Sequence, residues 1–362
     1  MRLKTLYINH YITGMGDAIL EFSFLQWFRK EINSDIYITT KLPLSTKAAR
    51  FLKAFIPEEK FFFLDLRGIK SKGLAGSISS VPRILTYFLT LLKHRWTIIL
   101  NGDLGGSDIE LFLMGFLRAP FKVALDYRGK HKSFKKVKVV NGSRRVWRPF
   151  NLAKMAEALP FHFSGKPGRT DLSSLLTIPP SPHLIPFLES GEKIITVFPF
   201  VDNHSFLRAP VSRWNFLIKE ILKRDKNTKI LIIGQTKDLK EWSSVLDVEG
   251  VYNLVGMTTL SDICHLINRC DVFIGHDGGL SHIAWALNKP RVILYRYPYP
   301  YQEQSPWFNY YPEETLKLFL PQAACFPCGH ASAVQCPVKL CRDSFQWDEI
   351  LSAIEMFAGW NK

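Results

Sequence analysis

Two glycine-rich turns carry an acid at points where a predicted strand leads into a predicted helix. The first is Gly-Met-Gly-Asp at 14–17, and the second is Gly-His-Asp-Gly-Gly-Leu-Ser-His at 275–282. The start of a helix exposes unpaired backbone N–H groups, which together with the helix dipole bind phosphate groups. The two turns therefore indicate a ligand that carries a diphosphate. The structural alternative for Asp17 is an acid that only complements the helix dipole.

The second turn holds residues suited to different parts of such a ligand. Gly278 and Gly279 can bring the backbone close to a diphosphate, while Ser281 and His282 add donors from the first helical turn. Asp277 is suited to a sugar or ribose hydroxyl, because a carboxylate repels phosphate. In the structural alternative, Asp277 caps the helix and His282 is a histidine at the edge of the core.

Positive side chains must neutralise the diphosphate, because the sequence contains no Asp-x-Asp pair to clamp a divalent metal. Arg208, Arg213 and Lys237 each follow a predicted strand of the second half and could take this role. We therefore expect chemistry that needs no metal ion.

Apolar runs alternate with helical patterns along both halves of the chain. The predicted strands are 4–10, 35–40, 61–66, 96–103 and 121–127 in the first half, and 193–200, 229–234, 250–256, 271–277 and 291–296 in the second. This rhythm is typical of parallel sheets, whose ligands bind beyond the carboxyl ends of the strands. We predict an α/β fold with two Rossmann-like doubly wound domains that face each other across a cleft.

A stretch rich in Pro, Gly and Ser between 160 and 191 separates the two halves. Two domains also fit the chain length of 362 residues, because domains commonly hold about 100 to 200 residues. We place the N-terminal domain at 1–178, the C-terminal domain at 179–343 and a packing helix at 344–362. The pattern of 347–360 is that of an amphipathic helix.

The charge is strongly positive and unevenly distributed. The formal net charge is +15, and residues 128–148 contain nine Lys or Arg and no acid. A solvated basic loop is the simplest interpretation of such a run, while a functional one is a surface for an acidic glycan, anionic lipid or nucleic acid. The apolar run 84–92 is too short to span a bilayer, which takes about 20 residues, so we expect a core helix, with contact at a membrane surface as the alternative. No signal peptide is evident, so we expect a cytoplasmic protein with peripheral membrane contact at most.

Three stretches of the chain resemble glycosyltransferase family 9, the family of ADP-heptose:lipopolysaccharide heptosyltransferases. They are the glycine turn and helix at 14–30, the basic motif at 208–221 and the block at 254–295. The resemblance implies a GT-B fold, with an acceptor-binding first domain and a second domain that binds the nucleotide sugar. It also implies metal-independent, inverting transfer of a heptose from ADP-heptose to an acceptor such as the anionic inner core of lipopolysaccharide.

The resemblance also implies roles for individual residues. Asp17 matches the general base that deprotonates the acceptor hydroxyl, and Arg208 lies in the basic motif and is our second catalytic candidate. The donor-binding residues implied by the family motifs are Asp238, Met257, Thr258, Asp277, Gly279, Leu280 and His282, to which we add Gly14, Gly16, Arg213 and Gly278 for the reasons given above.

Two positions depart from the family pattern. Residue 278 is glycine, where the family usually has a threonine or serine that donates to the diphosphate. The family's lysine of the basic motif aligns with Leu207, which leaves Arg208 one position away. We expect the longer reach of Arg208 to compensate for this shift.

The six cysteines fall into two groups. Cys264 and Cys270 lie on a predicted helix, where buried and inert thiols are expected. The other four lie within seventeen residues and could hold a structural zinc or iron ion, since disulfides are disfavoured in the cytosol. These four are Cys325, Cys328, Cys336 and Cys341.

Three functions remain open from the sequence. The first is transfer of a heptose or related sugar to an anionic glycan, or to a protein acceptor as in some relatives. The second is a noncatalytic module that only binds a nucleotide or glycan. The third is nucleic-acid binding, which would explain the charge but leaves both glycine turns without a role, so we expect no nucleic-acid partner.

Overall fold

The computed structural model describes thirteen segments of the chain. They are residues 2–8, 14–40, 47–63, 73–102, 108–127, 129, 132, 136–142, 148–200, 208–238, 248–295, 313–326 and 340–360. The chain divides into two units, Met1–Thr170 (unit 1) and Asp171–Lys362 (unit 2). The division falls inside the stretch 160–191, a little before the boundary predicted after residue 178.

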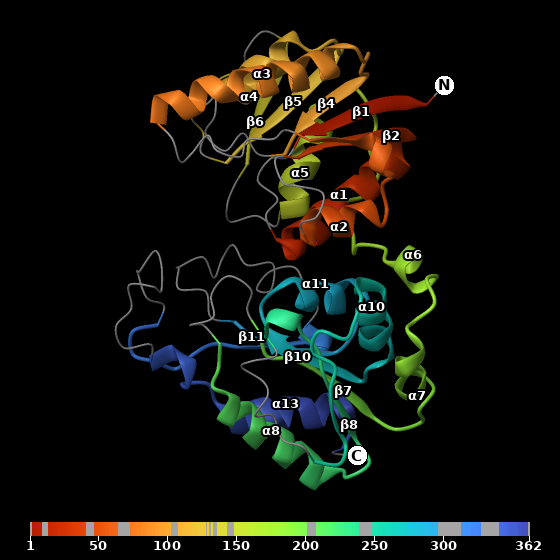
Figure 1. The fold of residues 1–362 in the computed structure, drawn as a ribbon, viewed down its shortest axis with the longest axis vertical. Helices are drawn as coiled ribbons and strands as arrows, with labels where there is room; N and C mark the ends of the chain where they lie inside the picture. The colour runs from red at the N-terminus through yellow and green to blue at the C-terminus, as the bar shows by residue number, and fades with distance from the viewer. Residues whose placement is uncertain are drawn as a thin grey trace. The chain divides into compact units, whose positions relative to one another are not determined.

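Unit 1 is built on a parallel sheet of six strands in the order β3-β2-β1-β4-β5-β6 (Figure 1). Its elements are β1 (Leu3–Ile8), α1 (Met15–Ile32), β2 (Ser34–Thr40), α2 (Lys47–Lys53), a 3-10 turn (Glu58–Lys60), β3 (Phe61–Phe63), α3 (Gly73–Leu92), β4 (Ile98–Asn101), α4 (Asp108–Phe116), β5 (Phe121–Asp126), β6 (Val137–Asn141) and α5 (Arg148–Glu157). β1 pairs with β2 on one side and with β4 on the other. The strand order therefore reverses between β1 and β4.

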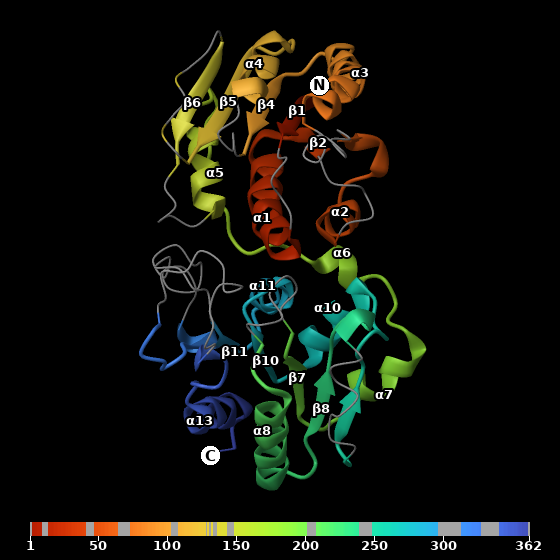
Figure 2. The same cartoon turned by 60° about the vertical axis from the view of Figure 1, so that its left-hand side comes forward.

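Unit 2 repeats this plan with the order β12-β11-β10-β7-β8-β9 (Figure 2). Its helices and strands are α6 (Ser173–Leu176), α7 (Ile185–Leu188), β7 (Ile194–Phe198), α8 (Val211–Arg224), β8 (Lys229–Ile232), β9 (Val251–Asn253), α10 (Leu260–Arg269), β10 (Val272–His276), α11 (Gly279–Ala286), β11 (Arg291–Leu294), β12 (Leu316–Phe319) and α13 (Trp347–Ala358), with 3-10 turns at Pro182–Leu184, η4 (Thr236–Asp238), Glu313–Thr315 and Leu340–Arg342. β7 pairs with β8 and β10, so the order reverses between β7 and β10. The prediction of two doubly wound, Rossmann-like domains is confirmed.

One strand of unit 1 was missed by the sequence analysis. β6 (Val137–Asn141) lies inside the cation-rich stretch 128–148, which we had interpreted only as a basic surface. Its Val137, Val139 and Val140 have the branched side chains that favour strands, and Val137 is fully buried. Because lysines lie among and before these valines, the segment was interpreted as basic and not as a short edge strand. The predicted helix at 239–247 lies outside the described residues.

Helices cover both faces of each sheet. In unit 1, α1 contacts α2 and α5, while α3 and α4 share a core cluster with β1, β4 and β5 on the opposite face (Figure 1). α1 is buried continuously from Ala18 to Leu25, which includes Glu21 and Ser23. In unit 2, α10 contacts α11, and α8 contacts α13 on the other face (Figure 2). The two sheets thus present the carboxyl ends of their strands to ligands, because their faces are covered.

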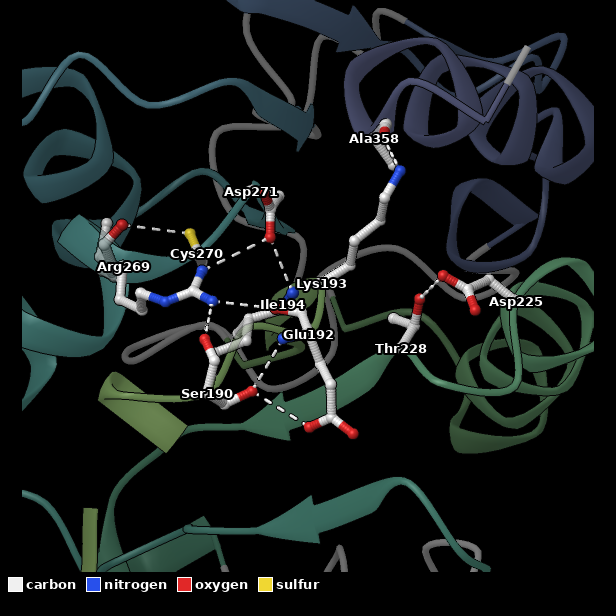
Figure 3. Close-up of polar contacts among 11 residues, drawn as sticks. Ser190, Glu192, Lys193, Ile194, Asp225, Thr228, Arg269, Cys270, Asp271 and Ala358 are labelled. Carbon is white, nitrogen blue, oxygen red and sulfur yellow. Dashed lines mark hydrogen bonds and ion pairs between the residues drawn. The ribbon is translucent and has the colours of Figure 1, made fainter. Parts of the chain in front are cut away.

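Polar contacts close the amino-terminal edge of the unit 2 sheet (Figure 3). The backbone N–H of Ile194 donates to Oδ2 of Asp271 at 2.8 Å, and the N–H of Asp271 donates to the carbonyl of Ile194 at 2.8 Å. Nζ of Lys193 donates to the carbonyl of Ala358 and lies 5.7 Å from the ring centroid of Trp360. The predicted C-terminal helix, α13, is thereby fixed to the start of β7.

The helices within the described segments include none that is both long and apolar enough to cross a membrane.

Candidate functional site

The first glycine turn forms the start of α1, as predicted. Gly14 is extended, with φ −105° and ψ 157°, and α1 begins at the next residue. Asp17 lies in the first turn and is partly exposed. A Cβ on Gly14 would lie 3.4 Å from Oδ2 of Asp17, so this carboxylate sits beside the Gly14 backbone. Gly14, Gly16 and Asp17 are therefore close together, after the carboxyl end of β1.

A buried polar network lies one helical turn after Asp17. Glu21 is fully buried, and its Oε2 accepts a hydrogen bond of 2.6 Å from the hydroxyl of Tyr7 on β1. Its Oε1 accepts a hydrogen bond of 2.7 Å from Nε of Arg148, the first residue of α5, and also contacts Nη2 of that arginine. The sequence analysis missed both Glu21 and Arg148. An acid in an otherwise apolar helical segment was the available signal for Glu21.

The charged groups of this network shift one another's pKa values, and Asp17 contributes to the shifts of both Glu21 and Arg148. Burial raises the pKa of Glu21, while Arg148 and the hydrogen bond from Tyr7 oppose that shift and Asp17 adds to it. Desolvation works against the charged form of Arg148, but the nearby Glu21 and Asp17 overcome it and raise the pKa of the guanidinium. Arg148 therefore remains a cation shared electrostatically by two carboxylates, and one of these is the predicted base.

In unit 2, two predicted site residues pair with each other. Nη2 of Arg208 donates to Oδ1 of Asp238 at 2.8 Å, and their side chains are only 7% and 2% exposed. Oδ2 of Asp238 accepts from the backbone N–H of Gln235 at 3.1 Å. We had assigned Arg208 to the diphosphate and had listed Asp238 separately among the donor-binding residues. In the structure, Asp238 holds the guanidinium of Arg208 in place.

An aromatic ring lies against the same guanidinium. Cζ of Arg208 lies 5.2 Å from the ring centroid of Phe200. A Cβ on Gly234 would lie 2.4 Å from the Phe200 ring, so only glycine allows the ring to occupy this position. The guanidinium of Arg208 is thus held by Asp238, which follows β8, and by Phe200, which follows β7.

The predicted loop at Met257 and Thr258 joins this group through the backbone. The N–H of Gly256 donates to the carbonyl of Gly234 at 3.0 Å. The side chain of Met257 is 55% exposed, whereas Oγ1 of Thr258 is buried and has no hydrogen-bond partner among the described residues. An apolar exposed side chain and a buried hydroxyl on one loop are suited to border a nucleotide.

The second glycine turn forms the start of α11. Gly278 precedes the helix, and the hydroxyl of Ser281 accepts from its N–H at 3.0 Å and donates to its carbonyl at 2.5 Å. Ser281, which we had considered as a phosphate donor, therefore caps its own helix. The N–H groups of Gly279 and Leu280 lie in the first turn, where backbone N–H groups have no partner within the helix.

His276 and His282 flank this turn and are both buried. Nε2 of His276 accepts from the backbone N–H of Ala209 at 3.1 Å, which connects the end of β10 to the segment that carries Arg208. Burial lowers the pKa of His282 to about 3, with a further contribution from the positive charge of Arg291. His282 is therefore neutral at physiological pH and does not add positive charge to a diphosphate site.

Arg213, a further predicted donor residue, is partly exposed and pairs with an acid near the C-terminal helix. Its Nε donates to Oδ1 of Asp343 at 2.5 Å, and both side chains are about half exposed. Nε of the adjacent Arg342 donates to the carbonyl of Arg208 at 3.2 Å. Among the described residues, the neighbouring Asp343 and Arg342 thus connect the side chain of Arg213 to the backbone of Arg208.

The cysteine cluster is only partly described. Cys325 is exposed and Cys341 is partly buried, while Cys328 and Cys336 lie outside the described residues. Within the described segments no group of three or more His, Cys, Asp and Glu side chains is arranged to hold a metal ion. The metal site stays a prediction. Cys264 and Cys270 are buried, and burial raises the pKa of each thiol to about 12, as expected for inert cysteines.

The site residues of unit 2 therefore converge on the carboxyl ends of β7, β8 and β10. These three strands are neighbours at the centre of the sheet, and the strand order reverses between β7 and β10. Such a reversal is where doubly wound sheets bind nucleotides. Most of the basic stretch 128–148 lies outside the described residues, so its predicted contact with an acidic partner stays a prediction.

Comparisons with known proteins identify relatives of this chain. The family model of glycosyltransferase family 9 (heptosyltransferase) matches residues 111–312. Lipooligosaccharide heptosyltransferase 2 of Campylobacter jejuni is 31% identical over 160 residues, which are 42% of this chain and 46% of that protein. The match thus spans about half the length of this curated relative.

Two solved structures show the same fold. The glycosyl transferase family 9 protein of Veillonella parvula superposes with a TM-score of 0.65 and 17% identity, over 98% of this chain and 97% of its own. The ADP-heptose lipopolysaccharide heptosyltransferase II of E. coli gives a TM-score of 0.63 and 17% identity, over 99% of each chain. These likenesses show the GT-B fold. Because the family model covers more than half of the chain, the protein belongs to glycosyltransferase family 9.

Proposed function

We propose that the protein is an inverting glycosyltransferase that moves a heptose, or a related sugar, from ADP-heptose to a hydroxyl of an anionic acceptor. The observation that carries the proposal is the convergence of Arg208, Asp238 and the start of α11 at the strand-order reversal of unit 2. That is where a nucleotide diphosphate binds in such folds. The E. coli relative of known structure is named as an ADP-heptose enzyme, which supports this donor.

In the proposed reaction, unit 2 stabilises the leaving group. The N–H groups at the start of α11 donate to the diphosphate, and Arg208 neutralises the charge that develops as the bond from the sugar C1 to ADP breaks. Asp238 and Phe200 hold the guanidinium before the donor arrives, so little reorganisation is needed at the moment of transfer. The loop at Met257 borders the nucleotide, and Asp277 takes a sugar or ribose hydroxyl.

Unit 1 supplies the proposed base. Asp17 accepts the proton of the acceptor hydroxyl while that oxygen attacks C1 from the face opposite ADP. The new C–O bond forms as the bond to ADP breaks, so the configuration at C1 inverts and ADP leaves with the electron pair. The proton moves late, because a sugar hydroxyl becomes acidic only as its oxygen bonds to carbon. No divalent metal takes part, since the cations of the protein serve this purpose.

We propose the inner core of lipopolysaccharide as the acceptor and the inner face of the cytoplasmic membrane as the working location. The net charge of +15 supports an anionic acceptor. The name of the Campylobacter relative, a lipooligosaccharide heptosyltransferase, supports the same class of glycan.

A panel of nucleotide sugars tests the donor. A ligand bound only by the folded state at about 100 times its Kd stabilises that state by about 2.7 kcal/mol, which is readily seen as a rise in melting temperature. We expect ADP-heptose and ADP to protect and UDP and GDP sugars to leave the melting temperature unchanged. Protection by UDP sugars alone would contradict the donor assignment. ADP release from ADP-heptose in the presence of EDTA then tests the reaction and its independence of metal ions.

Asp17→Asn tests the base. Positioned acid–base groups contribute about 100- to 10,000-fold to rate, so kcat should fall by that factor while protection by ADP-heptose is retained. Asp348→Asn is the matched control, because Asp348 is also an acid in a first helical turn, that of α13. Equal turnover of Asp17→Asn and Asp348→Asn would remove Asp17 from this role.

A further inference from the structure

We propose that an exposed apolar surface on α3 and α4 docks unit 1 onto an anionic lipid bilayer. Four side chains define this α3–α4 apolar face: Leu85, Leu89, Phe112 and Phe116. They are 52%, 48%, 51% and 44% exposed. Single exposed apolar residues are common on proteins, whereas four large ones on two helices that cover the same face of a sheet are typical of a docking surface.

The two helices hold this face away from the sheet. Both contribute to one core cluster through their opposite sides, with Tyr87 and Leu91 from α3 and Leu111 and Met114 from α4. Leu85 and Leu89 follow each other at i, i+4 on α3, and Phe112 and Phe116 do so on α4, where their ring centroids lie 4.7 Å apart. Each helix is thus apolar on both sides, although its outer side faces solvent.

The geometry brings the ends of the two helices together. α3 and α4 lie on the same face of the sheet and lead into the adjacent parallel strands β4 and β5, so they run in the same direction (Figures 1 and 2). After α3, the backbone N–H of Trp96 donates to the carbonyl of Arg118 after α4 at 3.1 Å. The row of Leu85 and Leu89 on α3 and the row of Phe112 and Phe116 on α4 therefore lead to the same edge of the sheet.

Positive charge gathers at that common edge. Lys93 follows Leu89 by four residues, as Leu89 follows Leu85. Arg118 accepts the hydrogen bond from Trp96 through its carbonyl, and Arg95 directly precedes Trp96. All three cations are exposed. Over the described side chains of 82–102 and 110–122, the acid is Glu110, which is buried and hydrogen-bonded to Asn101. The surface is therefore apolar in its middle and cationic at its edge.

This pattern favours a lipid surface over another protein. A helix that lies in a membrane interface buries its apolar side among the acyl chains, while its cations contact anionic headgroups. A second copy of the chain would bring the same cations to face each other across a symmetric interface, which is unfavourable. The inference deepens the membrane location proposed above and rests on that part of it, but it requires no sugar transfer.

Vesicle binding by the full-length protein tests the inference. We expect the wild type to sediment with vesicles of phosphatidylglycerol and phosphatidylcholine, and to bind phosphatidylcholine alone much more weakly. Leu85→Ser/Leu89→Ser and Phe112→Ser/Phe116→Ser should each weaken binding at least tenfold. The matched control is Phe216→Ser/Met356→Ser, which removes two exposed apolar side chains from unit 2 and should bind as the wild type does.

A gain-of-signal variant covers the case in which a serine variant fails to fold. Leu89→Trp should show more tryptophan quenching by lipids brominated on their acyl chains than the wild type, which has nine tryptophans, and Phe216→Trp should show no such increase. Lys93→Gln/Arg95→Gln/Arg118→Gln should remove the preference for anionic vesicles and most of the dependence of binding on salt.

Three results would overturn the inference. Serine variants that bind vesicles as tightly as the wild type would show that another surface docks, while the proposed membrane location would survive. A wild-type dimer that these variants convert to a monomer, without vesicle binding, would assign the face to a second copy. A wild type that ignores anionic vesicles would remove both the face and the location, whereas ADP release with a delipidated acceptor would still test the transfer separately.

Discussion

Arg148 and Glu21 form an ion pair that joins two helices of unit 1 across 127 residues of sequence, with Nε of the arginine 2.7 Å from Oε1 of the glutamate. Glu21 is fully buried, and Arg148 opposes the rise in its pKa that burial causes. We expect Arg148→Met to remove the cation that pairs with the buried Glu21. Breaking a buried pair in this way costs about 3 to 5 kcal/mol of unfolding free energy.

The raised pKa of Glu21 also predicts how the unfolding free energy changes with pH. A glutamate whose pKa is raised on folding stabilises the folded state below the pKa of the unfolded chain, about 4.3, and this contribution is lost as pH rises through the folded-state value. Without Arg148 that loss should steepen, to at most about 1.4 kcal/mol per pH unit. Urea unfolding between pH 5 and pH 8 measures it. Glu21→Gln/Arg148→Met should flatten the curve, and equal slopes for Arg148→Met and the wild type would contradict the prediction.

A double-mutant cycle should show strong coupling between Arg208 and Asp238. Asp238→Asn removes the carboxylate that pairs with the buried guanidinium of Arg208, which we expect to cost about 3 to 5 kcal/mol of unfolding free energy. Arg208→Met/Asp238→Asn removes both charges and should be more stable than Asp238→Asn alone. The single variant Arg208→Met, which completes the cycle, and the double variant should also lose the protection by ADP. Additive effects on stability would indicate that the pair is not a structural unit.

The strands and the two glycine turns could be predicted because their signals are local. Parallel strands appear as short apolar runs, and a turn that leads into a helix shows its glycines and its acid directly in the sequence. Pairings between distant charges leave no such trace. Arg208 and Asp238 were each assigned to a ligand, although folding brings them together at 2.8 Å. In the same way, nothing near Arg148 in the sequence indicates Glu21 as its partner.

A single substitution can introduce at position 278 the hydroxyl that the family usually has there. A Cβ on Gly278 would lie 3.7 Å from the ring of Phe198, an ordinary contact, and the φ of 170° is an extended value that any residue adopts. We expect Gly278→Ser to gain one hydrogen bond to the diphosphate, worth about 1 kcal/mol or about fivefold in affinity. Calorimetric titration with ADP measures this gain.

Gly278→Ala separates the hydroxyl from the backbone effect of this substitution. Both variants add a Cβ and restrict the unfolded chain, so both should be stabilised by about 0.4 to 1 kcal/mol. Only the serine should bind ADP more tightly. Equal ADP affinities of the two variants would show that the diphosphate does not lie within reach of position 278.

His282 should make the protein sensitive to acid. Burial and the positive charge of Arg291 lower its pKa to about 3, whereas an unfolded histidine titrates near about 6.5. Between these values the unfolded chain binds a proton that the folded chain does not. Stability contributed by neutral His282 is therefore complete above about pH 6.5 and decreases as pH falls toward 3, by up to about 1.4 kcal/mol per pH unit.

His282→Gln keeps a polar side chain and removes this titration. At pH 7 the variant should be less stable than the wild type, because it replaces a well-packed buried ring. As pH falls from 6.5 toward 4, the wild type should lose stability faster, so the difference between the two unfolding free energies narrows. Urea unfolding at half-unit steps of pH measures the difference. Parallel curves would mean that His282 binds its proton equally well in the folded and unfolded chains, and the helix start at α11 would then tolerate a charged imidazole.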